Sequence, residues 1–288
     1  MPPHPPSPAV ERPASETPEQ WTYVRRKRAK GTRRNLDNRG AVPPAPRPSL
    51  RSPSAIAAEY HRIRSAWAAP PSPCCVALAA LAAKSAQCCG PVSRAVCLGI
   101  GTFDPPDGGW EAKRRTYLQL IAFLVMVDEL EKHTGKTIPC FFQEPVFTSA
   151  DRAFIASLGH DVVDSPEGCD RVGPDTFLFG VHLYRPIYAL ALRNHLPALF
   201  VGTGWDVWHQ VLLSESHDLH HIQEMERTYA KAAFPQDPSS TAFSSTSVYW
   251  RTAASARRHS AGGQADTESK TDRPDTPSET EVESERIA

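Results

Sequence analysis

Five short loops of this sequence carry glycines or titratable, hydroxyl or aromatic side chains, each directly after an apolar run. Glycine lets a backbone approach a ligand closely, and Asp, Glu, His and Arg can exchange protons or counter charge. This chemistry suits an anionic or heterocyclic ligand, with Arg185 countering charge and Trp205 or Phe103 covering an apolar face. The candidate cleft residues are Gly99, Gly101, Thr102, Phe103, Glu144, Asp151, His182, Tyr184, Arg185, Gly202, Thr203, Gly204, Trp205 and Asp206.

The elements that must position these loops follow from the hydrophobic pattern. Buried strands are predicted by the apolar runs at 95–101, 138–143, 161–164, 176–181 and 198–204. Helical periodicity lies between them, with a glycine and basic residues ending the segment 110–135 and Ser149 as N-cap of the next helix. The alternation predicts an α/β, Rossmann-like three-layer fold with a mostly parallel sheet of about five strands. Ligands bind at the carboxyl ends of such strands, so the five loops are expected to converge.

Plainer interpretations of the same residues remain open. The sequence GIGTF at 99–103 lacks the third glycine of a dinucleotide fingerprint and suits a tight turn. Arg185 or His182 can instead pair with a carboxylate to hold loops together. No metal site is expected at the cysteine pairs 74–75 and 88–89, because the spacing typical of zinc ligands is missing. None is expected at His217, His220 and His221 either, because a solvated helix explains these histidines. Catalytic residues and cofactors stay unknown.

Composition divides the chain into four segments. Most of the 28 prolines precede residue 75 or follow residue 234. Residues 1–54 are therefore predicted to be a disordered Pro-rich basic tail, and residues 234–288 a disordered Ser/Thr/acidic tail. Between them we expect a helical linker at 55–91, with an apolar stripe of Ile56, Tyr60, Ile63 and Trp67, and a domain at 92–233. The last helix is expected to run from Asp206 toward Ala233, with a break near 214–216.

Charge is distributed unevenly although the net charge is zero. Residues 1–54 hold eleven Lys and Arg against four Asp and Glu, whereas residues 256–288 hold five against eight. The basic cluster suggests nuclear import, with weak nucleic-acid contact at most, so we expect residence in cytoplasm and nucleus. No apolar run reaches membrane length, and seven cysteines, an odd number, suit a reducing compartment. The cluster comprises Arg25, Arg26, Lys27, Arg28, Lys30, Arg33 and Arg34.

Six motifs resemble the SRR1-like domain of the sensitivity-to-red-light-reduced family, in the form seen in filamentous fungi. They are WTYVRRKR at 21–28, VCLGIGTF at 96–103, RRTYLQLIAF at 114–123, QEPVFTSAD at 143–151, FLFGVHLYRPIYALALR at 177–193 and ALFVGTGWDVW at 198–208. The resemblance implies a role in regulation: light and circadian signalling in plants, microtubule-related stability in yeast and heme-related roles in animals. It implies no established reaction.

The resemblance also maps the family's strand-end positions onto this chain. They correspond to Gly99, Gly101, Tyr117, Gln119, Pro145, Val146, Phe147, His182 and Gly202. Two departures stand out, namely Glu144 in place of a common aspartate and Gly204-Trp205-Asp206 in place of an Asn-Ser-Phe type ending. We therefore expect a regulatory or adaptor protein with protein partners, no membrane association and a cleft for a small-molecule ligand. An enzyme or nucleotide-binding protein that uses the same cleft is the alternative.

Overall fold

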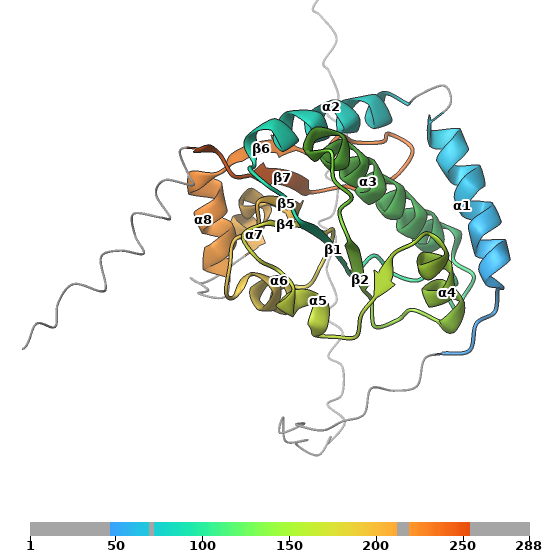
Figure 1. Cartoon of the computed structure of the whole chain (residues 1–288). Coiled ribbons are helices and arrows are strands. Elements are labelled where there is room, and N and C mark those ends of the chain that lie inside the picture. Colours follow the sequence, from blue (N-terminus) through green and yellow to red (C-terminus); the bar gives the residue numbers. More distant parts are fainter. Residues whose placement is uncertain (1–46, 69–71, 212–218, 254–288) are drawn as a thin grey trace, which may run out of the picture. The chain divides into compact units, whose positions relative to one another are not determined.

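A computed structural model of the 288-residue chain describes residues 47–68, 72–211 and 219–253. The basic cluster of residues 25–34, His217, and most of both predicted tails lie outside these ranges. In the described part, one mixed sheet carries helices on both of its faces (Figure 1). The strands are β1 Arg94–Leu98, β2 Cys140–Gln143, β3 Asp161–Val162, β4 Thr176–Gly180, β5 Leu199–Thr203, β6 Ala230–Ala233 and β7 Thr246–Trp250. The helices are α1 Pro53–Ala68, α2 Pro73–Cys88, α3 Trp110–Thr134, α4 Ser149–Ser157, α5 Glu167–Asp170, α6 Arg185–Leu192, α7 Trp205–Val211 and α8 His220–Thr228.

The direction in which successive strands are added to the sheet reverses between β1 and β4. Across the sheet the order is β3-β2-β1-β4-β5-β7-β6. The first five strands are parallel, whereas β7 runs antiparallel to both β5 and β6. From β1 the chain proceeds outward through β2 and β3, and then returns to the opposite side of β1 as β4. Neighbouring loops after β1 and β4 therefore lead away from each other, which opens space at their carboxyl ends.

The sheet confirms an α/β fold but has seven strands where the sequence predicts about five. β6 replaces the end of the predicted last helix, and β7 lies inside the segment 234–288 that was predicted to be disordered. The Ala-Lys-Ala-Ala sequence of β6 has high intrinsic helix propensity, and only pairing with β7 makes it a strand. All five residues of β7 are buried. The predicted domain end at residue 233 thus falls between two paired strands.

Two hydrophobic cores, one on each face of the sheet, account for the covering helices. α1 to α4 cover the face that presents Ala95, Cys97 and Phe177. α5, α6 and α8 cover the other face, where Leu178 and Phe200 lie, and Trp205 and Trp208 of α7 pack against the same core. Strands buried on both faces read as nearly continuous apolar runs, and this explains why β1, β4 and β5 were predictable from the sequence.

The segment predicted as a linker is part of the core. The four predicted residues of the α1 stripe are buried, and α1 packs against α3 and α4 while α2 packs along α3. Residues 47–52, predicted to belong to the disordered tail, are held by Asp104, whose carboxylate accepts the amides of Leu50 at 2.6 Å and Arg51 at 3.2 Å. No single described helix is long and apolar enough to span a membrane; α1 and α2 pass such a test only as a bent pair, by length and composition.

Local signals at helix ends were mostly correct. α3 ends as predicted, with Gly135 in the left-handed region (φ 66°) and its amide bonded to the carbonyl of Glu131 at 2.8 Å. The N-cap of α4 is Thr148, not the predicted Ser149, because Thr148 and Asp151 form a reciprocal capping box. The predicted last helix is divided into α7 and α8, which flank residues outside the described part.

Candidate functional site

A pocket of about 280 Å³ lies at the carboxyl ends of β1 and β4, where the strand order reverses. We call it the β1/β4 pocket. Its walls come from three loops, after β1, β2 and β4, and from one side of the first half of α3. The lining residues are Gly99, Ile100, Gly101, Thr102, Pro105, Ala112, Arg115, Thr116, Gln119, Val146, Val181 and His182. Three of the five predicted loops thus meet at the edge of the sheet that the strand-end rule selects.

Two glycines shape the loop after β1. Gly99 and Gly101 have φ values of 68° and 84°, which L side chains rarely adopt. A Cβ atom on Gly99 would lie 2.2 Å from Cδ2 of Leu183, and one on Gly101 would lie 3.0 Å from the Thr116 hydroxyl. That hydroxyl also donates to the carbonyl of Ile100 at 3.0 Å, which fastens the loop to α3. The glycines therefore serve both the turn and the close approach of the loop to its neighbours.

Two buried carboxylates hold the loop after β1 from behind the pocket. Glu144 accepts the amide of Gly101 at 2.7 Å through Oε2 and the amide of Val146 at 3.1 Å through Oε1. Asp151, fully buried, accepts the Thr102 hydroxyl at 2.6 Å and the Phe103 amide at 3.2 Å. Both carboxylates therefore hold loops through amides and a hydroxyl, whereas His182, for which a carboxylate partner was expected, bonds to the carbonyl of Ser244.

His182 lies on the pocket wall and is held by a segment predicted to be disordered. Its φ is 58°, unusual for a non-glycine residue, and its Nε2 lies 2.8 Å from the carbonyl of Ser244. A carbonyl only accepts, so Nε2 carries the proton and donates it to this bond. Gln119 is braced by the same segment, because its Nε2 donates to the carbonyl of Ala242 at 3.1 Å. The β6–β7 connection thus positions two residues that line the pocket.

Ten of the fourteen predicted cleft residues do not line the pocket, among them Phe103, Tyr184 and Arg185. Phe103 is fully buried against Tyr117 and Phe154, so it cannot cover a ligand. Tyr184 is 83% exposed and Arg185 opens α6, both beyond the pocket wall. The expected pairing of Arg185 with a ligand charge therefore has no support from this pocket.

The loop after β5 belongs to a different cluster. Gly202 allows close packing, since its Cβ would lie 3.0 Å from the Gly180 carbonyl, and the Thr203 amide donates to the Tyr188 hydroxyl at 3.0 Å. A Cβ on Gly204 would lie 2.7 Å from the Ser247 hydroxyl. These glycines are explained by packing against neighbouring strands and side chains.

Beyond Gly204, the amide of Trp205 donates to the hydroxyl of Tyr249 at 3.0 Å, and Asp206 pairs with Lys231 at 2.8 Å. Lys231 also meets Glu226 at 2.9 Å. Burial alone would lower the pKa of Lys231, but the two carboxylates outweigh it and raise that pKa. Hydrogen bonding to Lys231 lowers the pKa of Asp206. The cluster ties α7 and α8 to the edge of the sheet.

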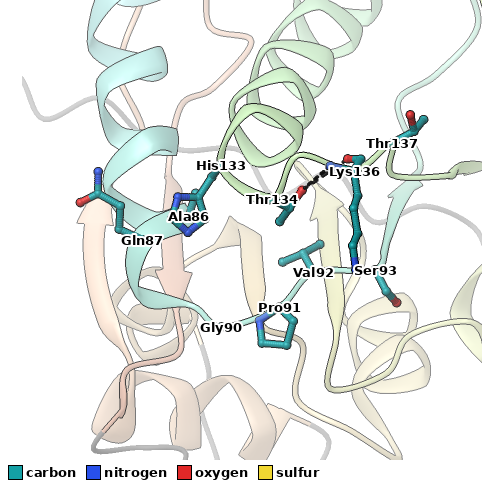
Figure 2. A pocket seen from close by; sticks show the side chains of 10 residues that line it. All are labelled: Ala86, Gln87, Gly90, Pro91, Val92, Ser93, His133, Thr134, Lys136 and Thr137. Carbon is teal, nitrogen blue, oxygen red and sulfur yellow. Dashed lines mark hydrogen bonds between the residues drawn. The ribbon is translucent and has the colours of Figure 1, made fainter.

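A larger hollow of about 450 Å³ lies at the opposite edge, between the ends of α2 and α3 (Figure 2). Figure 2 shows His133 and Lys136 on its wall, with the Lys136 amide bonded to the Thr134 hydroxyl at 3.3 Å. Both helices end here, and basic side chains near helix carboxyl ends are favoured by the exposed carbonyls. These basic side chains are thus explained without a ligand.

The cysteines and histidines do not assemble a metal centre in the described ranges, where no group of three or more His, Cys, Asp or Glu side chains is placed to hold an ion. Cys74 and Cys89 are buried, and burial raises the pKa of each thiol to about 11. Cys88 is exposed and Cys75 is half-buried. Both pairs lie at the ends of α2, which holds them apart.

The candidate residues do not include the pocket residue Arg115, because it lies on a helix rather than in a loop. The family motif at 114–123, which contains it, is the signal that could have found it. Arg115 is exposed on α3 and lines the β1/β4 pocket. By contrast, five of the nine positions mapped from the family resemblance line this pocket: Gly99, Gly101, Gln119, Val146 and His182. Tyr117 and Phe147 from the same set are buried in the core.

The chain matches a protein-family model. No curated protein and no solved structure matches the chain. The family model of the SRR1 domain matches residues 79–250, which begin inside α2 and end at the last residue of β7. The match covers well over half of the chain and includes the strands, the pocket loops and the β6–β7 connection that braces them. The chain therefore belongs to the SRR1 domain family.

Proposed function

We propose that this protein is a regulatory or adaptor protein whose SRR1 domain binds a small molecule in the β1/β4 pocket. The observation that carries the proposal is the convergence of three loops and α3 on a hollow at the reversal point of the strand order. Its volume of about 280 Å³ is close to the lower end of small-molecule sites, roughly 300 Å³. Five family strand-end positions on its wall further support it.

The topology supports a Rossmann-like assignment within this proposal. The five parallel strands follow the order 3-2-1-4-5, which is the order of the doubly wound dinucleotide-binding folds. In those folds the ligand lies at the reversal of strand order, next to the loop after the first strand. The glycine turn at 99–101 occupies the corresponding place here.

The test fills the pocket without straining the backbone. Ala112 is exposed on α3 and lines the pocket, so Ala112→Leu adds volume there with little effect on the helix. Ala156→Leu on α4 is the matched control, because Ala156 is exposed and away from the pocket. Native mass spectrometry of the full chain purified from cells should show a bound small molecule in the wild type and the control, and its loss in Ala112→Leu. Absence of any adduct in the wild type, or an equal adduct in Ala112→Leu, would contradict the proposal.

We also propose that the protein resides in cytoplasm and nucleus and engages protein partners. The basic cluster of residues 25–34 supports the nuclear part of this proposal. Replacing Arg25, Arg26, Lys27 and Arg28 with alanine in a fluorescent fusion should lower the nuclear signal. An unchanged distribution would argue against import through this cluster.

A further inference from the structure

Arg115 is the one residue of fixed charge among the described residues that line the β1/β4 pocket. It is exposed, and it forms no hydrogen bond or ion pair with any other residue that the structure describes. Its neighbours on α3 differ in this respect. Arg114 donates to Ser239 at 2.7 and 2.8 Å, and Lys113 pairs with Glu59 at 3.4 Å. The guanidinium at the pocket is thus available to a ligand.

The nearby acids do not neutralise this cation. No Asp or Glu is among the described lining residues. Glu144 and Asp151 lie behind the loop after β1, and their oxygens accept hydrogen bonds from Gly101, Val146, Thr102 and Phe103. Neither carboxylate forms a hydrogen bond or ion pair with Arg115 in the described part of the chain. The pocket therefore presents an unmatched positive charge next to hydroxyl and amide groups.

We infer that the β1/β4 pocket takes a small organic oxyanion, a phosphate monoester or carboxylate, whose charged group is bound by Arg115. The inference rests on the proposed function and names its ligand class. A guanidinium binds carboxylate and phosphate oxygens in pairs, which gives orientation as well as affinity. Ile100, Val146 and Val181 supply an apolar wall for the remainder of the molecule. The volume of about 280 Å³ selects a ligand of sugar-phosphate size over a dinucleotide.

The assignment replaces Arg185 by Arg115 as the residue that counters ligand charge. Arg185 opens α6 and is not on the pocket wall, whereas Arg115 lies one helical turn before Gln119 on α3. Residues at i and i+4 share a helix face, so both side chains border the same space. Gln119 is fixed by the carbonyl of Ala242. The oxyanion site is thus formed by one face of α3 and the loops after β1, β2 and β4.

The experiment compares full-length wild type, Arg115→Gln and Lys136→Gln. Lys136 is the matched control, because it is an exposed cation on the other hollow, so both variants lose one positive charge. Ribose 5-phosphate, inorganic phosphate, succinate and uncharged ribose are titrated at constant ionic strength by calorimetry. We expect saturable binding of at least one oxyanion to the wild type and to Lys136→Gln, and affinity lower by about tenfold or more in Arg115→Gln.

The probes distinguish a phosphate ligand from a carboxylate ligand. They also test the oxyanion inference separately from the proposed function. Preference for ribose 5-phosphate over succinate identifies a phosphate ligand, and the reverse preference a carboxylate. Equal binding of an oxyanion to Arg115→Gln and wild type, or its loss in Lys136→Gln, overturns the inference. Ribose binding as tightly as ribose 5-phosphate overturns the oxyanion but leaves a ligand pocket. No oxyanion bound by the wild type also overturns it, while the adduct found by mass spectrometry decides the proposed function separately.

Discussion

Replacing Asp151 with alanine is expected to be among the most damaging single changes on the pocket side of the sheet. The side chain is fully buried and accepts three hydrogen bonds: from the Thr148 amide at 2.8 Å, the Phe103 amide at 3.2 Å and the Thr102 hydroxyl at 2.6 Å. Alanine leaves the two amides without an acceptor and breaks the capping box of α4. The loop after β1 loses its attachment to α4 at the same time.

The magnitude follows from those groups. Each of the two unsatisfied buried amides costs about 1–3 kcal/mol, and the lost hydroxyl bond about 1 kcal/mol more, so the free energy of unfolding should fall by about 3–7 kcal/mol. For a domain of this size, this corresponds to a decrease in melting temperature of roughly 6–28 °C. Asp151→Asn keeps one acceptor oxygen and should cost about half as much.

Urea denaturation followed by circular dichroism measures the change in the free energy of unfolding. Asp164→Ala is the control, because Asp164 is exposed and its pair with Arg152 at 2.6 Å is a surface salt bridge, worth less than about 1 kcal/mol. A loss below about 1 kcal/mol for Asp151→Ala would refute the reasoning. It would mean that water reaches the two amides when the carboxylate is absent.

Three further predictions test other parts of the fold. Tyr188→Phe should lower the free energy of unfolding by about 1–3 kcal/mol in urea titrations, because the Thr203 amide and the Gly180 carbonyl lose their shared hydroxyl; a change near zero would contradict this. Ile56→Ala should cost about 2–5 kcal/mol, since Ile56 is fully buried; if α1 were a detached linker, the stability of the domain would not change. Burial lowers the pKa of His160, so the unfolded chain binds more protons and the free energy of unfolding should fall as the pH drops below about 6.5. His160→Gln should flatten this pH dependence between pH 7 and pH 5. An unchanged slope would assign the pH dependence to other groups.

The pocket illustrates how far local patterns reach. The turn glycines at 99 and 101 and the family position of His182 were identified from the sequence because each follows a recognisable apolar strand. Arg115 gave no such signal, since a basic residue on an amphipathic helix is ordinarily solvated. Arg115 matters because no Asp or Glu is among the described residues that line the pocket with it. That arrangement exists only once the loops have assembled.

The errors share a similar cause. Residues 234–250 contain Ser, Thr and Pro at a density typical of a tail, and yet β7 is inserted between β5 and β6 and is fully buried. A short strand is recognised from sequence by its neighbours along the chain, whereas its stability comes from neighbours across the sheet. The same holds for α1 and for residues 47–52, which are ordered by contacts with α3, α4 and Asp104.

By itself, the sequence determined what depends on local order. The five parallel strands, the stripe of α1, the glycine end of α3 and the glycine turn after β1 all follow from periodicity, capping and backbone freedom over a few residues. Only the tertiary structure decided which carboxylates accept hydrogen bonds from loop amides and hydroxyls, which arginine remains unpaired at the pocket, and that β6 and β7 complete the sheet. The physical reason is that hydrogen-bond satisfaction and charge pairing are settled between residues distant in sequence, where folding alone brings donor and acceptor together.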